Sequence, residues 1–145
     1  MDFITSMKIS ASGLNVQRQR MDTIASNLAN IETTRTPEGG PYRRKDVVVS
    51  SMPLAENFAV SLNRELENSI RQAVVVKIIE DQSEPILVFN PDHPDANEEG
   101  YVALPNINLM TEMVNMINAT RSFEANVQAI EAAKSMALRA IDLGR

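Results

Sequence analysis

The sequence predicts an α+β fold, in which long N- and C-terminal helices form an antiparallel coiled-coil-like pair and a small β-rich domain is inserted between them. Three observations predict it: an apolar heptad pattern at each end of the 145-residue chain, β-branched segments between them, and few aromatic residues. A core built almost wholly from aliphatic side chains suits helix packing. We divide the chain into an N-terminal helix (1–35), the inserted domain with its linkers (36–105) and a C-terminal helix (106–145).

The first helix is predicted over residues 3–30. Its apolar residues recur at alternating steps of three and four, which is the spacing of heptad positions a and d. They are Ile4, Met7, Ala11, Leu14, Met21, Ala25 and Leu28. Gly13 costs about 1 kcal/mol relative to Ala inside a helix, which indicates that another backbone approaches closely there.

The inserted region is predicted to be rich in strands. Pro37 and the pair Gly39-Gly40 favour an extended link and a turn after the first helix. Four β-branched segments follow, each bounded by turn-forming residues: 42–51, 72–80, 85–89 and 101–105. Residues 53–68 carry Leu or Phe at every fourth position and favour a short helix.

The second helix is predicted from residue 109 to the C-terminus. Asn108 is placed to cap its first turn, and Glu112 supplies a negative charge that suits the helix dipole. The same heptad spacing runs along it, interrupted by Thr120 and Lys134. Its apolar members are Leu109, Met113, Met116, Phe123, Val127, Ile130, Ala137 and Ile141.

The two patterns predict that the helices pack on each other within one chain. We expect eight residues to make this contact: Met7, Leu14, Met21, Leu28, Met116, Phe123, Val127 and Ile130. A lone pair leaves apolar residues on the outer faces of both helices, and large exposed apolar patches mark interfaces. We expect six of these residues to meet other subunits: Ile9, Val16, Ile24, Met110, Ile117 and Leu138.

Composition excludes several classes of function. The net charge is −5, and the only basic cluster in the sequence is "RRK" at residues 43–45, which we interpret as the exposed face of a strand. Because nucleic-acid binding needs a basic surface, we expect no nucleic-acid partner. The chain has no Cys and one His, His93, which leaves no thiolate or multi-histidine metal site. No Gly-rich phosphate loop is present. We therefore expect no enzyme, no catalytic residue, no cofactor and no metal.

Two further features of the sequence argue against a calcium site and against a membrane-spanning segment. Asp95, Asn97 and Glu99 partly follow the order of a calcium loop, but its twelfth position is Asn106 where Glu is needed, so we interpret residues 90–100 as an ordered turn. The chain has no run of 18 apolar residues, and its start, "MDFITSMKIS", has no continuous apolar segment. We expect neither membrane insertion nor a cleaved signal peptide.

Four segments resemble a known family. "SASGLNVQRQRMDTIASNLANIETT" resembles the N-terminal signature of bacterial flagellar rod, hook and filament-axis proteins, and "MVNMINATRSFEANVQAIEAAKSMALRAIDLGR" resembles their C-terminal helix. "TRTPEGGPYRRKDVVV" and "VFNPDHPDANEEGYVALPNINLM" are similar to motifs of the proximal-rod proteins of the flagellar basal body.

The resemblance implies a structural subunit of the proximal rod, which polymerises into a helical tube that transmits torque and forms part of the export channel. The implied partners are other rod proteins, copies of the chain itself, the flagellar export apparatus and basal-body ring components. The implied location is the periplasm-spanning rod, reached without a cleaved signal peptide. From the residues alone, an alternative is a stand-alone helical-hairpin adaptor that binds a partner helix.

Overall fold

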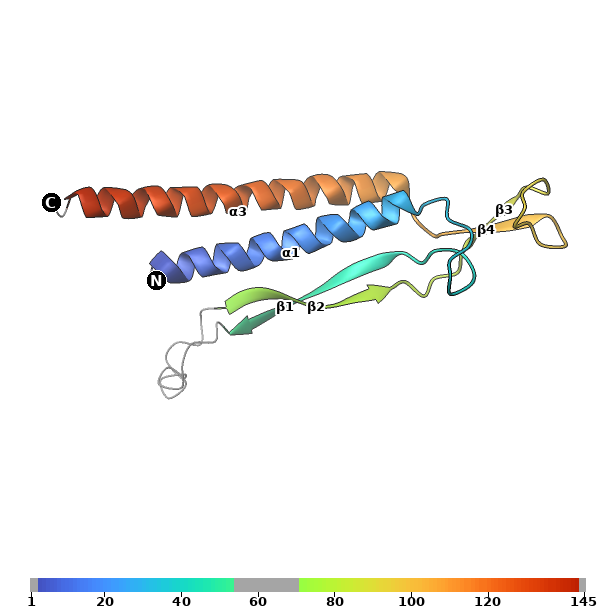
Figure 1. Ribbon diagram of the computed structural model, residues 1–145, viewed down its shortest axis with the longest axis horizontal. Coiled ribbons are helices and arrows are strands. Elements are labelled where there is room, and N and C mark those ends of the chain that lie inside the picture. The colour runs from blue at the N-terminus through green and yellow to red at the C-terminus, as the bar shows by residue number, and fades with distance from the viewer. Residues whose placement is uncertain (1–2, 54–70, 144–145) are drawn as a thin grey trace.

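The computed structural model describes residues 3–53 and 71–143 of an elongated molecule. Helices α1 (Phe3–Ala29) and α3 (Leu109–Leu143) lie side by side and run antiparallel, so the start of α1 and the end of α3 are at the same end (Figure 1). Two antiparallel hairpins lie between them in the chain. The predicted α+β class, with long terminal helices around a small β region, is confirmed. The short helix predicted over 53–68 falls outside the described residues, apart from Pro53 at the end of a strand.

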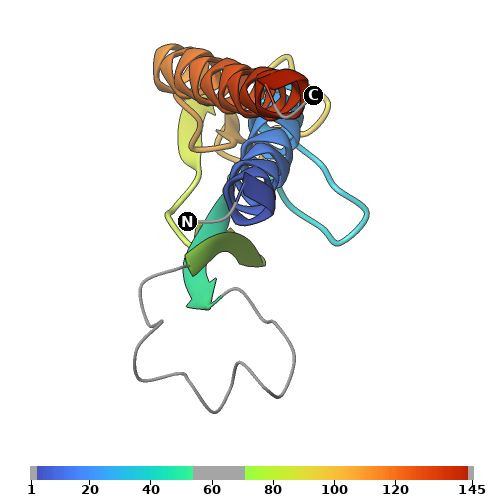
Figure 2. The same cartoon turned by 90° about the vertical axis from the view of Figure 1, so that its left-hand side faces the viewer.

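The first hairpin covers the side of α1 that faces away from α3. Strands β1 (Lys45–Pro53) and β2 (Arg71–Glu80) pair with Lys45 opposite Glu80 and Pro53 opposite Arg71, and an irregularity lies between Val48 and Val49. The end-on view shows α1 between α3 and this ribbon (Figure 2). α1 therefore has two neighbours within its own chain.

The second hairpin projects beyond the ends of the helices (Figure 1). It consists of β3 (Ile86–Phe89) and β4 (Tyr101–Leu104). The rings of Phe89 and Tyr101 meet edge to face with their centroids 5.4 Å apart. Gly100 has a φ of +81°, and an added Cβ there would lie 3.0 Å from the Phe89 ring, so only glycine fits without strain.

Local sequence explains where α3 begins and how the chain turns after α1. The Asn108 side chain accepts a hydrogen bond from Thr111 N at 3.0 Å, which confirms the predicted cap of α3. After α1, Thr36 N donates to Gly40 O at 2.9 Å, and Gly39 and Gly40 have φ values of +92° and +78°. The predicted turn is therefore present, and it uses the two residues that adopt such angles freely.

The core is small and partly polar. Its buried apolar members among the described residues are Val16, Ile24, Val47, Val102, Ile107, Ala119 and Ala133. The largest side chains that are fully buried there are not aliphatic: they are Glu112 at 1% exposed and Asn27 at 0%. Buried polar groups need hydrogen-bond partners, so these two residues mark a specific arrangement.

Candidate assembly interface

α1 and α3 meet in one definite register. An added Cβ on Gly13 would lie 3.1 Å from the carboxamide of Asn126, so the close approach expected at this glycine comes from a side chain of α3 and not from its backbone. Two heptads later on α1 and two heptads earlier on α3, Asn27 Nδ2 donates to Glu112 Oε2 at 3.2 Å. The same spacing on the two helices is what an antiparallel coiled-coil-like pair requires.

The contact is rotated from the predicted a and d seam. On α3 the buried residues are Glu112, Ala119 and Ala133, each one position before a position of the predicted heptad pattern: Met113, Thr120 and Lys134. Met113, a predicted seam residue, is 48% exposed, and Ile4 of α1 is 57% exposed. The prediction assumed that α1 has a single partner. Because α1 also packs on the β1–β2 ribbon, it turns to face both neighbours, and small residues let α3 come close.

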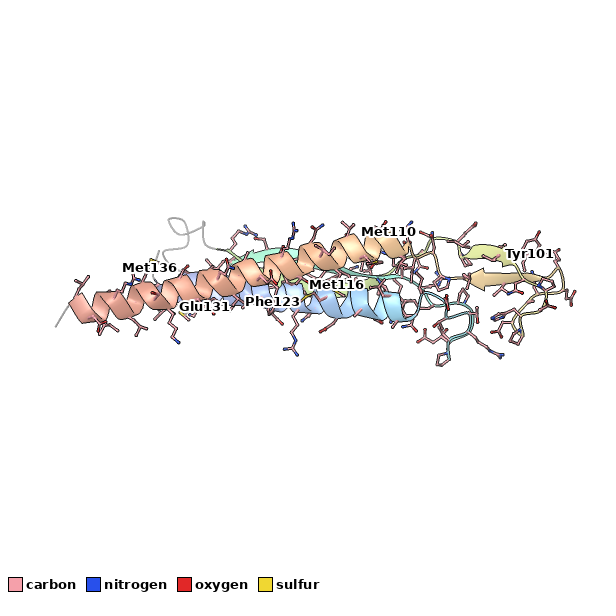
Figure 3. All side chains as sticks on the ribbon, turned by 90° about the horizontal axis from the view of Figure 1, so that it is seen from above. Tyr101, Met110, Met116, Phe123, Glu131 and Met136 are labelled. Atoms are coloured by element: carbon pink, nitrogen blue, oxygen red, sulfur yellow. The ribbon has the colours of Figure 1, made fainter. Side chains whose placement is uncertain are left out.

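The eight residues expected to pack between the helices all lie in partly covered positions. Met7, Leu14, Met21, Leu28, Met116, Phe123, Val127 and Ile130 are half-buried. The Sδ atom of Met21 lies 3.6 Å from Thr120 Oγ1 of α3. Figure 3 labels Met116 and Phe123 along the edge of α3 that borders α1. The pairing of these eight residues with one another stays a prediction.

The three α1 residues expected at the subunit interface are placed differently. Val16 and Ile24 are each 5% exposed, and Ile9 is half-buried. One turn before Val16, the Ser12 hydroxyl accepts a hydrogen bond from Ala73 N of β2 at 3.2 Å, so the ribbon covers this side of α1. Val16 and Ile24 are therefore core residues of the subunit, with little surface left for another subunit, and the expectation that they meet one stays a prediction.

The outer face of α3, by contrast, is apolar and uncovered. Met110, Ile117 and Leu138 were expected to meet other subunits, and they are 70%, 51% and 54% exposed. Val114 joins the first two at helical spacing and is 54% exposed. Figure 3 labels Met110 on the side of α3 away from α1. Apolar residues grouped in this way are typical of a surface that another molecule covers.

A buried cluster, the polar clasp of Asn27, Arg44 and Glu112, joins both helices to the β1–β2 ribbon. Asn27 Nδ2 donates to Lys45 O at 2.8 Å as well as to Glu112. Asn27 Oδ1 accepts from Lys45 N at 2.9 Å and from the Tyr42 hydroxyl at 3.2 Å. A carboxamide offers two donors and two acceptor sites, so Asn27 is fully satisfied.

The clasp also contains an ion pair. Arg44 places both Nε and Nη2 at 2.9 Å from Glu112 Oε1, and its Nη1 lies 3.6 Å from Asp46. Burial lowers the pKa of Arg44, but hydrogen bonding to Glu112 and attraction from Glu112 and Asp46 outweigh that effect and raise the pKa above its ordinary value. The guanidinium is therefore a fixed positive partner for the buried carboxylate.

Sequence reasoning missed this cluster. Arg44 was interpreted as part of an exposed basic face, yet its side chain is only 24% exposed. Glu112 was assigned to the helix dipole alone. The available signal was Asn27, an uncharged polar residue two heptads after Gly13, which is the spacing of one helix face.

A polar groove of about 280 Å³ lies between α1, β1 and α3, and Gln17, Arg20, Asn115 and Ser122 are among the residues that line it. Over residues 3–53 and 71–143, no three acidic, histidine or cysteine side chains gather as metal ligands. Within the same residues, neither long helix is apolar enough to cross a membrane.

The loop of residues 90–100 is held by its own polar groups. Asn97 Oδ1 accepts from Tyr101 N at 2.8 Å and from Glu99 N at 3.1 Å, and His93 Nδ1 accepts from Asp95 N at 3.1 Å. These side-chain acceptors fold the loop as an ordered turn. A 2.8 Å hydrogen bond from Thr34 to Asp95 ties the loop to the linker that follows α1.

Comparison with known protein families supports the resemblance of the two terminal helices to those of flagellar rod proteins. Residues 7–35 match the model described as "Flagella basal body rod protein". Residues 98–143 match the model described as "Flagellar basal body rod FlgEFG protein C-terminal". The fold and these two matches define the class of protein, that of flagellar basal-body rod proteins.

Individual relatives give the family more narrowly. The flagellar basal-body rod protein FlgC of Bacillus subtilis is 45% identical, over 97% of each chain. FlgC of Borreliella burgdorferi is 42% identical, over 94% of this chain and 93% of the relative, and FlgC of Escherichia coli O6:H1 is 37% identical over the full length of both. The chain belongs to the FlgC family of flagellar basal-body rod proteins.

Proposed function

We propose that the chain is a structural subunit of the proximal rod of the flagellar basal body. In this role it polymerises into a helical tube that transmits torque and forms part of the export channel, and it catalyses no reaction. Its relatives are named as rod proteins, which supports the structural role. The stand-alone adaptor is not favoured, because the similarity to rod proteins extends over nearly the whole chain.

The main support for the proposal is that the outer face of α3 is apolar and exposed. Met110, Val114 and Ile117 are each more than half exposed on one side of α3, and this helix lies within the C-terminal family match. In water this surface is unfavourable by about 25 cal/mol for each Å² of apolar area. A neighbouring subunit that covers it supplies a driving force for assembly.

The proposed partners are other rod proteins, further copies of the chain, the flagellar export apparatus and basal-body ring components. We propose that the protein reaches the periplasm-spanning rod through that export apparatus without a cleaved signal peptide. Neither nucleic acid nor direct insertion into the membrane has a part in this function.

The test is a pair of substitutions at one exposed site. Ile117→Asp should leave the folded chain intact, because the residue is 51% exposed, and should abolish incorporation by placing a charge in the covered face. Ile117→Met keeps the site apolar and is the matched control. Immunoblots of purified basal bodies measure incorporation, and soft-agar spreading measures motility.

Equal incorporation and motility of both variants would contradict the assignment of this face. Electron microscopy of basal bodies from a strain that lacks the gene tests the wider function. The expected result is loss of the rod beyond the membrane ring, together with loss of hook and filament. Complete, rotating flagella in that strain would reject the role as a rod subunit.

A further inference from the structure

The seam between α1 and α3 repeats along its length. Ala119, Asn126 and Ala133 follow one another at heptad intervals on the side of α3 that faces α1. If α3 slid by one heptad, about 10.5 Å of helix, Ala119 or Ala133 would take the place of Asn126 beside Gly13, and a small side chain fits there as well. The apolar part of the seam therefore permits more than one alignment.

The polar clasp does not repeat. If α3 slid by one heptad in one direction, Asn27 would face Ala119 and lose its acceptor on α3. The carboxylate of Glu112, which is 1% exposed, would lose the Asn27 amide and both donors of Arg44. A carboxylate removed from water without such partners is strongly unfavourable.

Arg44 extends this specificity to the ribbon. It lies directly before β1, and the backbone of Lys45, the first residue of β1, both donates to and accepts from Asn27. The position of the ribbon along α1 and the position of α3 along α1 are thus fixed at the same residue. One cluster aligns all three elements.

We propose that Asn27, Arg44 and Glu112 form a register lock, a positioning cluster that selects one alignment of α1, α3 and the β1–β2 ribbon. The lock decides where the outer face of α3 lies relative to α1 and the β1–β2 ribbon. It provides specificity more than stability, because a buried ion pair is often matched in stability by apolar residues of similar size. A single buried polar contact sets alignment in coiled coils by the same principle.

The chain has no cysteine, so engineered disulfides can report the register directly. Met21→Cys with Thr120→Cys reports the observed alignment, because these side chains are 3.6 Å apart. Met21→Cys with Val127→Cys reports an alignment shifted by one heptad. A disulfide forms only when the two Cα atoms come within about 7 Å. Each pair is introduced into the full-length chain and oxidised.

The variant to compare is Arg44→Leu with Glu112→Leu, which removes the ion pair and keeps the bonds of Asn27 to Lys45. We expect the shifted disulfide to be absent in the otherwise unchanged chain and to rise at least tenfold in this variant, with an unchanged or higher urea midpoint. A merely structural role would lower the midpoint without producing the shifted disulfide. Arg43→Leu with Glu124→Leu makes the same changes at exposed residues and should give only the observed alignment.

The remaining outcomes overturn the proposal. A helical Arg44→Leu/Glu112→Leu chain that still forms only the observed disulfide shows that the seam sets the register without the lock. The shifted disulfide in the otherwise unchanged chain shows that no lock operates. If that variant loses its helical signal, Arg44→Met with Glu112→Met replaces it. Loss of helix in both variants makes the cluster a requirement for folding and not for register.

Discussion

Replacing Asn27 by Ala isolates the contribution of the clasp to stability. The substitution leaves Lys45 N, Lys45 O and Glu112 Oε2 each without one hydrogen bond, whereas the Tyr42 hydroxyl loses one bond but keeps its contact with Ser26 Oγ. An unpaired buried group costs about 1–3 kcal/mol, and water can reach the half-buried Lys45, so we take the low end for each group and expect a loss of about 3 kcal/mol. Ala is the better helix former by about 0.5 kcal/mol, which leaves a net loss of about 2.5 kcal/mol.

The assay is urea unfolding of the purified chain, followed by far-ultraviolet circular dichroism. With a slope of about 1–3 kcal/mol per molar urea, the midpoint should fall by roughly 1–2.5 M. Asn15→Ala is the matched control, because Asn15 lies exposed on the same helix, and it should leave the midpoint unchanged or slightly higher. A midpoint for Asn27→Ala that equals the Asn15→Ala value would refute the claim that the buried carboxamide holds the three elements together.

Three further substitutions test other features. Gly13→Leu should push Asn126 away and lower the free energy of unfolding by about 2 kcal/mol, whereas Gly13→Ala should change it far less; urea midpoints distinguish them, and tolerance of Leu would contradict the close contact. Gly100→Ala should strain the backbone at its positive φ and crowd the Phe89 ring. We therefore expect the rate of amide hydrogen exchange in the β3–β4 hairpin to rise about tenfold and the urea midpoint to stay the same. An unchanged exchange rate would contradict the strain. Asn108→Ala should cost about 1 kcal/mol by removing the cap of α3, measured by thermal unfolding, and an unchanged melting temperature would show that the cap contributes nothing.

Heptad spacing was sufficient to predict the extent of both helices, because period and turn signals are local properties of the chain. It was not sufficient to predict which way each helix faces. Ile4 and Met113 belong to the heptad pattern by spacing, yet they are 57% and 48% exposed. The true orientation depends on the second neighbour of α1, the β1–β2 ribbon, and spacing in one segment carries no information about a neighbour elsewhere in the chain.

The number of neighbours of each helix also explains which of the residues expected at the subunit interface are exposed. Met110 and Ile117 lie on the exposed side of α3, because a single neighbour covers only the opposite side of that helix. Val16 and Ile24 of α1 are buried, because α1 has neighbours on two sides. Glu112 and Arg44 are separated by many residues in the sequence, so the pairing of their charges could be recognised only after folding brought them together.

The two ends of the molecule are unlike. At one end α3 runs on past the start of α1, and at the other the β3–β4 hairpin extends past both helices (Figure 1). Ile141, one turn after Ala137 on the side of α3 that faces α1, is 62% exposed in that overhang. An array in which such molecules join head to tail therefore has a direction. Its tip and its base offer different surfaces to an incoming molecule, so addition at one end is chemically distinct from addition at the other.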